Sequence, residues 1–366
     1  METETIDLET VEAEPIDEAK AGAFTGRVLG DTAAAATVVL AAIGDKLGLF
    51  KDLARGGPAT SAELARRTQT TERYAREWLA GMAAAGYVTY DATDATYSLP
   101  PEHVPTLAYE SGPAFFGGVH QELLGAIAQY NPLVEAFRHG GGVDLATYPD
   151  DLHTGIARFT TMWHEHLLTQ VWLPAVPQAQ AMLERGVDVA DIGCGQGKAL
   201  INLVQAFPQS RYVGYDNLAV SVEQARAHAE AAGVGDRVRF LELDAARGLP
   251  ESFDLITAWD VVHDAVDPLG MLQSVREALR PGGIFLCLDI NCADDPAANT
   301  GPVATLLYGF SLLLCMPVSL AHGGAGLGTL GLPESKLREL ATSAGFSSVT
   351  KVAMDNPINN LYVVRR

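Results

Sequence analysis

The second half of the chain alternates between two kinds of hydrophobic pattern. From Val187 onward, short apolar runs are separated by longer stretches whose apolar residues recur at helical spacing. Apolar runs of this length predict buried strands, and the helical spacing predicts helices between them. The predicted strands are 187–192, 212–215, 238–243, 253–259 and 284–290, and the predicted helices are 198–207, 221–232 and 269–279. Strands that alternate with helices predict an α/β fold with a doubly wound, Rossmann-like sheet.

The C-terminal end departs from this alternation. A predicted helix at 334–344 is followed by two strand-like runs, 349–354 and 361–364, with no helix between them. Two such strands predict an antiparallel hairpin at one edge of the sheet. Residues 291–333 fit no repeat of the pattern, and we expect this long insertion to form a loop that acts as a lid or a pocket wall.

The first half of the chain has a different organisation. Residues 31–47 are Ala-rich with helical spacing, and Thr60 or Ser61 and Thr70 or Thr71 are candidate caps of two short helices. Two β-rich runs, 87–90 and 96–99, follow as a small hairpin. This order is that of a winged helix. We therefore divide the chain into a disordered acidic tail (1–20), a helical winged-helix domain (21–110), a helical linker and pocket wall (111–180) and the α/β domain (181–366).

Charge argues against a polyanionic partner. The chain of 366 residues carries 25 Lys and Arg against 45 Asp and Glu, a net charge of −20. An acidic protein repels phosphate backbones and anionic membranes, so we expect no nucleic acid and no membrane among its partners. The winged-helix segment has eight basic and ten acidic residues, which favours a packing or dimerisation role. A regulator that senses a ligand and reads DNA remains an alternative, and an exposed basic stripe on 72–85 would favour it.

Cysteine usage and apolar runs indicate a cytoplasmic protein. The four cysteines form no C-x-x-C pair, the acidic N-terminus lacks the features of a secretory signal, and the apolar run 310–321 is short and contains Pro317. We also expect no metal. His164 and His166 are two residues apart and point to different sides of a helix, and Asp294 and Asp295 have no partner at ligand spacing.

A glycine-rich loop carries the strongest chemical signal. Residues 191–197 read Asp-Ile-Gly-Cys-Gly-Gln-Gly at a strand-to-helix junction, where glycines let a ligand approach the backbone. The G-x-G-x-G spacing differs from the dinucleotide fingerprint and from a P-loop. Asp216 ends the next strand and Asp244 the third, where carboxylates can accept ribose hydroxyls and an adenine amine. With Asp191 they favour a cationic ligand over a pyrophosphate.

These motifs resemble those of class I S-adenosylmethionine-dependent methyltransferases. Asp191–Gly197 matches their first motif, Asp216 the ribose acid, Asp244 the adenine acid and 279–283 the turn before their fifth strand. The winged helix resembles the dimerising domain of small-molecule O-methyltransferases, and segments 259–264, 315–320 and 323–331 are similar to a bacterial winged-helix group. The resemblance implies a homodimeric transferase with S-adenosylmethionine as cofactor. The implied cofactor-binding residues are Asp191, Gly193, Gly195, Gly197, Asp216, Asn217, Asp244, Ala245, Trp259 and Asp260.

The resemblance also implies a catalytic base. His263 stands where these O-methyltransferases have a histidine that deprotonates the acceptor hydroxyl, and Asp289 or Asp264 would orient it. The relatives have Glu at the place of Asp289, and Asp is shorter. The apolar insertion favours a small, apolar or aromatic acceptor; its expected contacts are Phe116, Trp163, His166, Tyr308 and Met316. Non-methyl-transfer chemistry at the same cofactor site, such as hydroxylation or decarboxylation, remains an alternative.

Overall fold

The computed structural model describes residues 16–366, which form two compact units divided after Ala108. Most of the predicted acidic tail, residues 1–15, lies outside the described residues. The expectation of disorder is wrong for its last residues, because helix α1 (Glu18–Lys46) begins there. Asp17 caps this helix by accepting hydrogen bonds from the backbone N–H groups of Ala19 and Lys20, so the helix starts well before the predicted residue 31.

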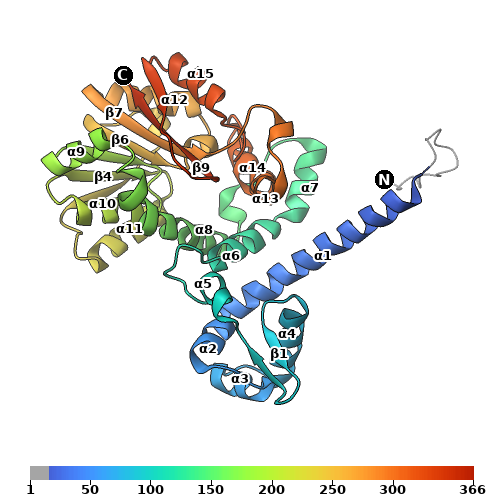
Figure 1. Cartoon of the computed structure of the whole chain (residues 1–366). Coiled ribbons are helices and arrows are strands. Elements are labelled where there is room, and N and C mark those ends of the chain that lie inside the picture. Colours follow the sequence, from blue (N-terminus) through green and yellow to red (C-terminus); the bar gives the residue numbers. More distant parts are fainter. Residues whose placement is uncertain (1–15) are drawn as a thin grey trace. The chain divides into compact units, whose positions relative to one another are not determined.

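The first unit is a winged helix, as predicted. It contains α1, α2 (Leu49–Gly56), α3 (Ser61–Thr68), α4 (Glu72–Ala84), β1 (Thr89–Asp91), β2 (Thr96–Ser98) and α5 (Val104–Leu107) (Figure 1). A capping box starts α3, because the Thr60 hydroxyl accepts from the Glu63 N–H and the Glu63 carboxylate accepts from the Thr60 N–H. Phe50 and Trp78 pack edge to face in a core that they share with Leu64, Leu79 and Met82.

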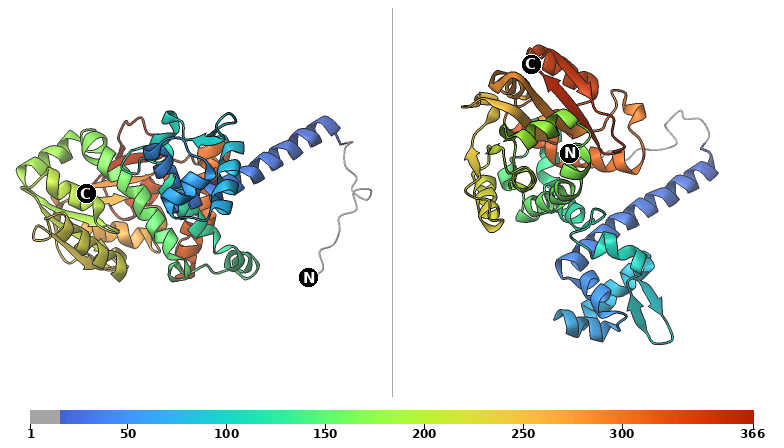
Figure 2. Two further views of the ribbon diagram at one scale, coloured as in Figure 1. Left: turned by 90° about the horizontal axis from the view of Figure 1, so that it is seen from below. Right: turned by 60° about the vertical axis from the view of Figure 1, so that its left-hand side comes forward.

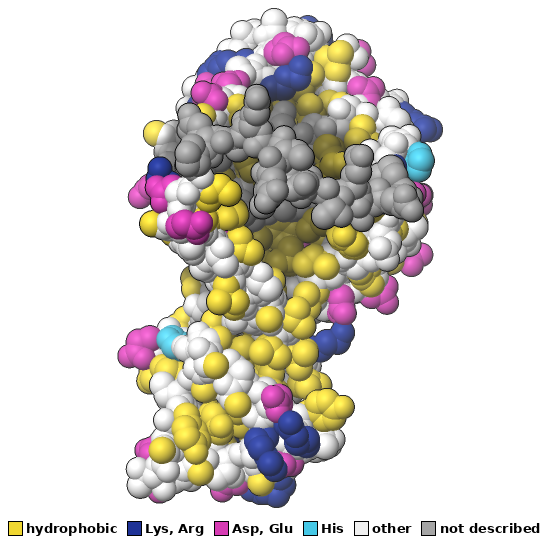
Figure 3. Space-filling view, turned by 90° about the vertical axis from the view of Figure 1, so that its right-hand side faces the viewer, with side chains coloured by type: hydrophobic (Ala, Val, Ile, Leu, Met, Phe, Trp, Pro, Cys, Tyr) yellow, Lys and Arg dark blue, Asp and Glu magenta, His cyan; other side chains and the backbone are white. Residues whose placement is uncertain are grey.

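Helix α1 leaves most of its apolar side chains exposed within this unit. Its buried residues are Ala41 and Gly44, whereas Phe24, Val28 and Leu29 are exposed. Hydrophobic side chains are also visible at the surface in the space-filling view of Figure 3, where basic and acidic side chains lie near one another. On α4, Arg73 pairs with Glu77 and Arg76 with Glu72. These two arginines therefore form no unpaired basic stripe.

The second unit opens with a helical segment. It comprises α6 (Gly117–Ile127), α7 (Tyr130–His139), α8 (Asp150–Trp163), a π-helical continuation (His164–Trp172) and α9 (Pro177–Arg185). Helices α6 and α8 pack closely because glycines lie at their contact. A Cβ on Gly155 would lie 2.3 Å from the backbone nitrogen of Glu122, and one on Gly125 would lie 2.6 Å from that of Leu152.

The rest of the second unit is the predicted α/β fold, built on a seven-stranded sheet in the order β5-β4-β3-β6-β7-β9-β8. The elements are β3 (Asp188–Ile192), α10 (Lys198–Ala206), β4 (Arg211–Asp216), α11 (Ala219–Ala231), β5 (Val238–Glu242), β6 (Phe253–Trp259), α12 (Pro268–Ala278), β7 (Leu279–Ile290), α15 (Glu334–Ser343), β8 (Ser348–Lys351) and β9 (Asn359–Arg365). The first five strands are parallel, and β9 pairs antiparallel with β7 and β8. The predicted edge hairpin is confirmed.

Helices cover both faces of this sheet (Figures 1 and 2). One hydrophobic core joins α9, α10 and α11 to one face, and a second core joins α12 and α15 to the other. The carboxyl ends of β3, β4, β6 and β7 therefore lie along one edge of a rigid sheet. The strand order reverses direction between β3 and β6, and doubly wound folds bind ligands in the crevice at such a point.

The insertion 291–333 differs from the expected loop, and its apolar stretch is longer than the expected run 310–321. Helix α13 (Gly301–Phe310), a π-helical turn (Ser311–Cys315) and α14 (Met316–Ala321) follow one another without a break, so 301–321 is helical and not loop. The helix passes Pro317 because the π-helical turn precedes it. This stretch and α1 are each long and apolar enough to cross a membrane by length and composition, a test that core helices of soluble proteins also pass. The Tyr148 hydroxyl donates to the Leu313 carbonyl at 2.7 Å, which ties the insertion to the helical segment.

Candidate active site

The glycine loop between β3 and α10 has the backbone that its sequence predicts. Gly193, Gly195 and Gly197 all have positive φ, between 51° and 77°. A Cβ on Gly193 would lie 2.6 Å from a Val261 methyl carbon, and one on Gly197 would lie 2.7 Å from the Phe240 ring. A Cβ on Gly195 would meet no atom within 4 Å. The loop is thus packed from behind at its two ends and open at its centre, where a ligand can approach the backbone.

Two buried carboxylates lie at this loop. Asp216 accepts from the backbone N–H groups of Gly195 (2.8 Å) and Leu218 (3.0 Å), and Asp191 accepts from the Thr257 hydroxyl (2.6 Å). Burial raises the pKa of Asp191 to about 7, and the neighbouring Asp216 adds to this effect. Burial also raises the pKa of Asp216. Backbone N–H groups and a hydroxyl, not basic side chains, donate these hydrogen bonds to the two acids, which favours a cationic ligand at this loop.

The remaining predicted adenosine contacts lie after β4 and β5. Asp244 accepts from the Ala246 N–H at 3.0 Å and pairs with Arg247 at 3.2 Å, so it caps a short 3₁₀ turn. Asn217 is exposed beside Asp216, and Ala245 is buried. Oδ1 of Asp244 makes the cap and Oδ2 pairs with the exposed Arg247. Each carboxylate oxygen can accept more than one hydrogen bond, so this local role does not prevent Asp244 from accepting a ligand amine.

Trp259 and Asp260 follow one another at the end of β6 but have different surroundings. The Trp259 ring stacks on Trp172 with centroids 5.5 Å apart. Asp260 has φ +55°, a left-handed conformation that is rare outside glycine. Its carboxylate accepts from the Asn359 amide at 2.7 Å. Burial raises the pKa of Asp260, and the charge of Asp289 raises it further.

His263 is buried between two carboxylates. Its Nδ1 lies 2.7 Å from Oδ1 of Asp289, and its Nε2 lies 3.3 Å from Oδ1 of Asp264. Both candidate orienting acids therefore contact the imidazole, on opposite nitrogens. The Asp289 side chain, although shorter than Glu, reaches the imidazole. Its Oδ2 also accepts from the backbone N–H of His263, at 3.3 Å. Asp289 is fully buried at the end of β7, whereas the side chain of Asp264 is about half exposed (49%).

The charge of His263 follows from this pairing. Burial acts to lower the pKa of His263, but the carboxylates of Asp264 and Asp289 outweigh it and hold this pKa well above its usual value. Cys315 lies beside the imidazole and accepts from the Thr329 hydroxyl at 3.0 Å. The ligand atoms of His263, Asp264 and Cys315 lie within 4.8 Å of one another, close enough to hold a metal ion. This group was not predicted from the sequence.

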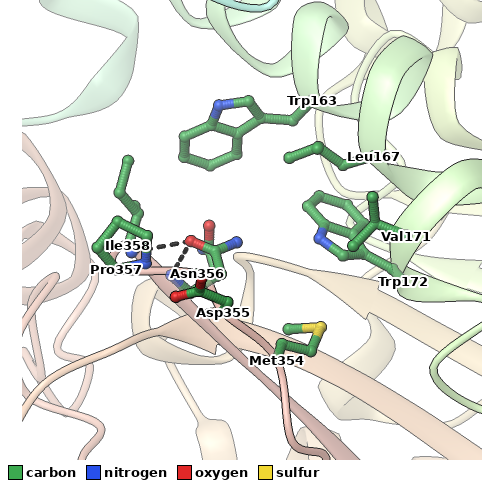
Figure 4. Close-up of a pocket in the computed structure, with 10 residues that line it drawn as sticks. Trp163, Leu167, Val171, Trp172, Met354, Asp355, Asn356, Pro357 and Ile358 are labelled. Carbon is green, nitrogen blue, oxygen red and sulfur yellow. Dashed lines mark hydrogen bonds between the residues drawn. The ribbon is translucent and has the colours of Figure 1, made fainter.

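A cavity of about 210 Å³ lies between the π-helical segment after α8 and the β8–β9 loop (Figure 4). Trp163, Leu167 and Val171 line one side, and Asn356 and Ile358 line the other. The cavity also includes Asn359, which bonds Asp260. One residue of the cavity wall thus contacts Asp260 at the end of β6.

The five predicted acceptor contacts do not share these surroundings. Trp163 lines the cavity, and Nε2 of His166 lies 2.7 Å from the Ser111 carbonyl oxygen. Phe116 and Tyr308 are more than two-fifths exposed, and Met316 begins α14. His164 is the more enclosed of the two histidines, and burial lowers its pKa to about 4.

Three residues that sequence reasoning missed complete the site. Thr257 bonds Asp191, Asn359 bonds Asp260, and Glu122 is a buried acid on α6. Thr257 and Asn359 give no signal along the chain, because their partners are far away in sequence. Glu122 does give one: it is the acidic residue of a helix that is mostly glycine and apolar residues.

Comparison with known proteins agrees with the fold of both units. Residues 34–109 match the family model of an Rv2258c-like winged HTH domain, and residues 183–308 match a methyltransferase domain. The chain therefore carries a winged helix followed by a methyltransferase domain.

Relatives and solved structures extend this comparison. A ubiquinone biosynthesis O-methyltransferase of Cereibacter sphaeroides is 33% identical over 106 residues, 29% of this chain and 42% of the relative. The match thus spans less than half the length of this curated relative. The structures of PigF with SAH (TM-score 0.71) and of the mitomycin 7-O-methyltransferase MmcR (0.70) are each 20% identical and cover 96% of this chain and 100% of theirs. At that identity they show the shared fold.

Proposed function

We propose that the protein is a methyltransferase that transfers the methyl group of S-adenosylmethionine to an oxygen atom of a small, apolar or aromatic molecule. The observation that carries the proposal is the pairing of His263 with Asp289 at the sheet edge that also holds the glycine loop. The matched methyltransferase domain and the O-methyltransferase relatives support the same reaction class.

The residues at the glycine loop fit the proposed cofactor. The open face of Gly195 accommodates a nucleoside against the backbone, and Asp216 lies where it can accept ribose hydroxyls. A ligand that carries an ammonium and a sulfonium group would favour the ionised forms of Asp191 and Asp216, whose pKa values burial raises. When bound, S-adenosylmethionine supplies an electrophilic methyl group on its sulfonium centre.

His263 acts as the base in this proposal. The proton of the acceptor hydroxyl passes to Nε2, and Asp289 stabilises the resulting imidazolium through Nδ1–H. Because Asp264 pairs with the same Nε2, it must turn away before the acceptor hydroxyl can occupy its place. Its half-exposed side chain has room to do so.

Cofactor binding provides the first test. Isothermal titration calorimetry should give micromolar affinity for S-adenosylmethionine and S-adenosylhomocysteine, about −8 kcal/mol, and none for NAD. Asp216→Ala should abolish this binding, and Asp236→Ala, which removes an exposed acid, should not. A folded protein that binds neither cofactor form would contradict the proposal. An acceptor screen with His263→Ala as the inactive variant would then test the base.

We also propose that the protein is a cytoplasmic homodimer that binds no DNA. The exposed apolar side chains of α1 support a second copy of this chain as its partner. The pairing of Arg73 and Arg76 with glutamates of the same helix supports a packing role for the winged helix, because phosphate binding needs clustered free cations. Four buried, free cysteines support a reducing compartment.

A further inference from the structure

Glu122 is a buried acid, and one of its two carboxyl oxygens lacks a hydrogen-bond partner among the described residues. Its side chain is 8% exposed, and Oε2 makes no hydrogen bond among the described residues. The backbone of Glu122 is fixed in place, because Gly155 of α8 packs directly against it. Helix α6 also packs against the π-helical turn that carries Cys315. Leaving a buried polar group unpaired destabilises a fold, so an unpaired carboxyl oxygen in a fixed position favours a ligand that can pair with it.

The carboxylate of Asp264 lies near enough to Glu122 to act on its charge. Burial raises the pKa of Glu122 to about 8, and the negative charge of Asp264 is the second cause. Asp264 in turn pairs with Nε2 of His263. Glu122 therefore belongs to the surroundings of the proposed base, although it lies more than 140 residues away in sequence.

Negative charge exceeds positive charge in this cluster. The charges of Asp264 and Asp289 act on both Asp260 and His263, and His263 is the cationic side chain among these four residues. An anionic acceptor would be repelled at this place, and a cation would be attracted. A cation would also give Oε2 of Glu122 the partner that it lacks.

We propose that Glu122 and Asp264 form a cation subsite beside His263, which binds a protonated amine on the methyl acceptor. This inference rests on the proposed methyltransferase function and specifies its substrate class as a hydroxylated, apolar or aromatic amine. The amine keeps its proton. Glu122 is neutral at pH 7 in the empty site, ionises as the ammonium group arrives and releases its proton to solvent.

Three probes of the same size separate the charge of the acceptor from its shape. We would titrate the full chain, saturated with S-adenosylhomocysteine, with tyramine, 4-ethylphenol and 4-hydroxyphenylacetate at pH 7. We expect tyramine to bind at least about tenfold more tightly than either of the others, which corresponds to about 1.4 kcal/mol. Calorimetry in buffers of different ionisation enthalpy should show a proton released with tyramine and none with 4-ethylphenol.

The variants assign the effect to Glu122. Glu122→Gln keeps the size of the side chain and should remove both the tyramine preference and the proton release. Glu277→Gln, an exposed carboxyl on α12, should leave both unchanged. Equal binding of tyramine and 4-ethylphenol, no binding of tyramine up to millimolar concentration, or a preference that persists in Glu122→Gln would each overturn the inference.

Two further measurements distinguish the amine subsite from a metal site and from failure of the methyltransferase proposal. Zn²⁺ is titrated alone, because His263, Asp264 and Cys315 offer it ligands; tight Zn²⁺ binding that Glu122→Gln weakens, with no tyramine preference, would make the subsite a metal site. Binding of S-adenosylhomocysteine is measured first. If it binds and the amine preference is absent, the amine subsite fails alone. If it does not bind, the methyltransferase proposal fails, and tyramine binding to the cofactor-free chain still decides whether the subsite exists.

Discussion

Two carboxylates contact the His263 imidazole from opposite sides, and their charges raise its pKa above the usual value. A base must be deprotonated to act, so its raised pKa moves the acidic limb of the pH–rate profile above pH 6.5. The sequence placed His263 beside Asp264 by adjacency and opposite Asp289 by resemblance. That both acids contact the same ring is a property of the fold, because β6 and β7 bring residues 26 apart to 2.7 Å.

Asp264→Asn should lower the pKa of His263, because one of the two carboxylates that raise it is removed. The acidic limb of kcat/KM should then move to lower pH by about one unit or more, the usual effect of a nearby opposite charge. Initial rates of methyl transfer across pH 5–9 would measure this shift. Asp267→Asn is the matched control, since the Asp267 side chain caps α12 and is not among the groups that shift the pKa of His263. A limb that stays in place in Asp264→Asn would contradict the assignment.

Glu122 should make the stability of the fold depend on pH. Its folded pKa of about 8 lies above the usual 4.5, so the folded state holds a proton that the unfolded state has lost. The free energy of unfolding must therefore fall as pH rises from about 4.5 to 8. Glu122→Gln removes this loss and should be more stable than the parent at pH 8, by a few kcal/mol at about 1.4 kcal/mol for each pKa unit.

Urea denaturation of both proteins at pH 5 and pH 8 would test this difference. Taking the difference between the two proteins cancels the similar contribution of Asp191. If the advantage of Glu122→Gln is the same at both values of pH, Glu122 does not titrate as described.

At the scale of elements, the glycine loop requires both a left-handed backbone and close packing against Val261, and two variants separate these requirements. Gly193→Ala adds a methyl group to a residue with φ +65° and brings it within 2.6 Å of Val261. Gly233→Ala adds the same methyl group at φ +68° with no atom within 4 Å. Both variants pay the cost of left-handed backbone, about 1–2 kcal/mol. Gly193→Ala must in addition move the loop or Val261.

Gly193→Ala should therefore weaken S-adenosylmethionine binding by about tenfold or more, whereas Gly233→Ala should lose stability alone. Calorimetry and thermal unfolding of the two variants would distinguish the effects. Equal cofactor affinity in both variants would mean that the loop tolerates the displacement.

Elements that depend on local pattern were predictable, and elements that depend on distant contacts were not. The strands β3 to β7 follow from apolar runs, and α3 from the Thr60–Glu63 capping box. The helix through Pro317 was missed because a proline argues against a continuous helix, and a π-helical turn before it has no signature in one sequence. The burial of Glu122 was also missed, because it depends on packing against Gly155 of another helix.

At the scale of the whole molecule, the question is whether a second copy of the chain covers helix α1, most of whose apolar side chains are exposed. α1 has 29 residues, yet within its own unit it buries Ala41 and Gly44, and exposes Phe24 (64%), Leu29 (70%) and Ile43 (42%). A helix of this length with so little burial gains little stability from packing, on which most protein helices depend. A second copy of this chain would supply that packing, and a homodimer buries the same face twice.

Leu29→Glu places a charge among the exposed apolar side chains of α1 and should convert the proposed dimer into a monomer, since an unpaired charge in an apolar interface costs several kcal/mol. Light scattering after size-exclusion chromatography would give the mass of each form, with 38.8 kDa expected for the variant. Tyr74→Glu, which alters an exposed aromatic residue on α4, serves as the comparison and should remain dimeric. If the parent protein is itself monomeric at micromolar concentration, the exposed face of α1 has another partner, and the two membrane-length apolar helices direct the next measurement to lipid vesicles.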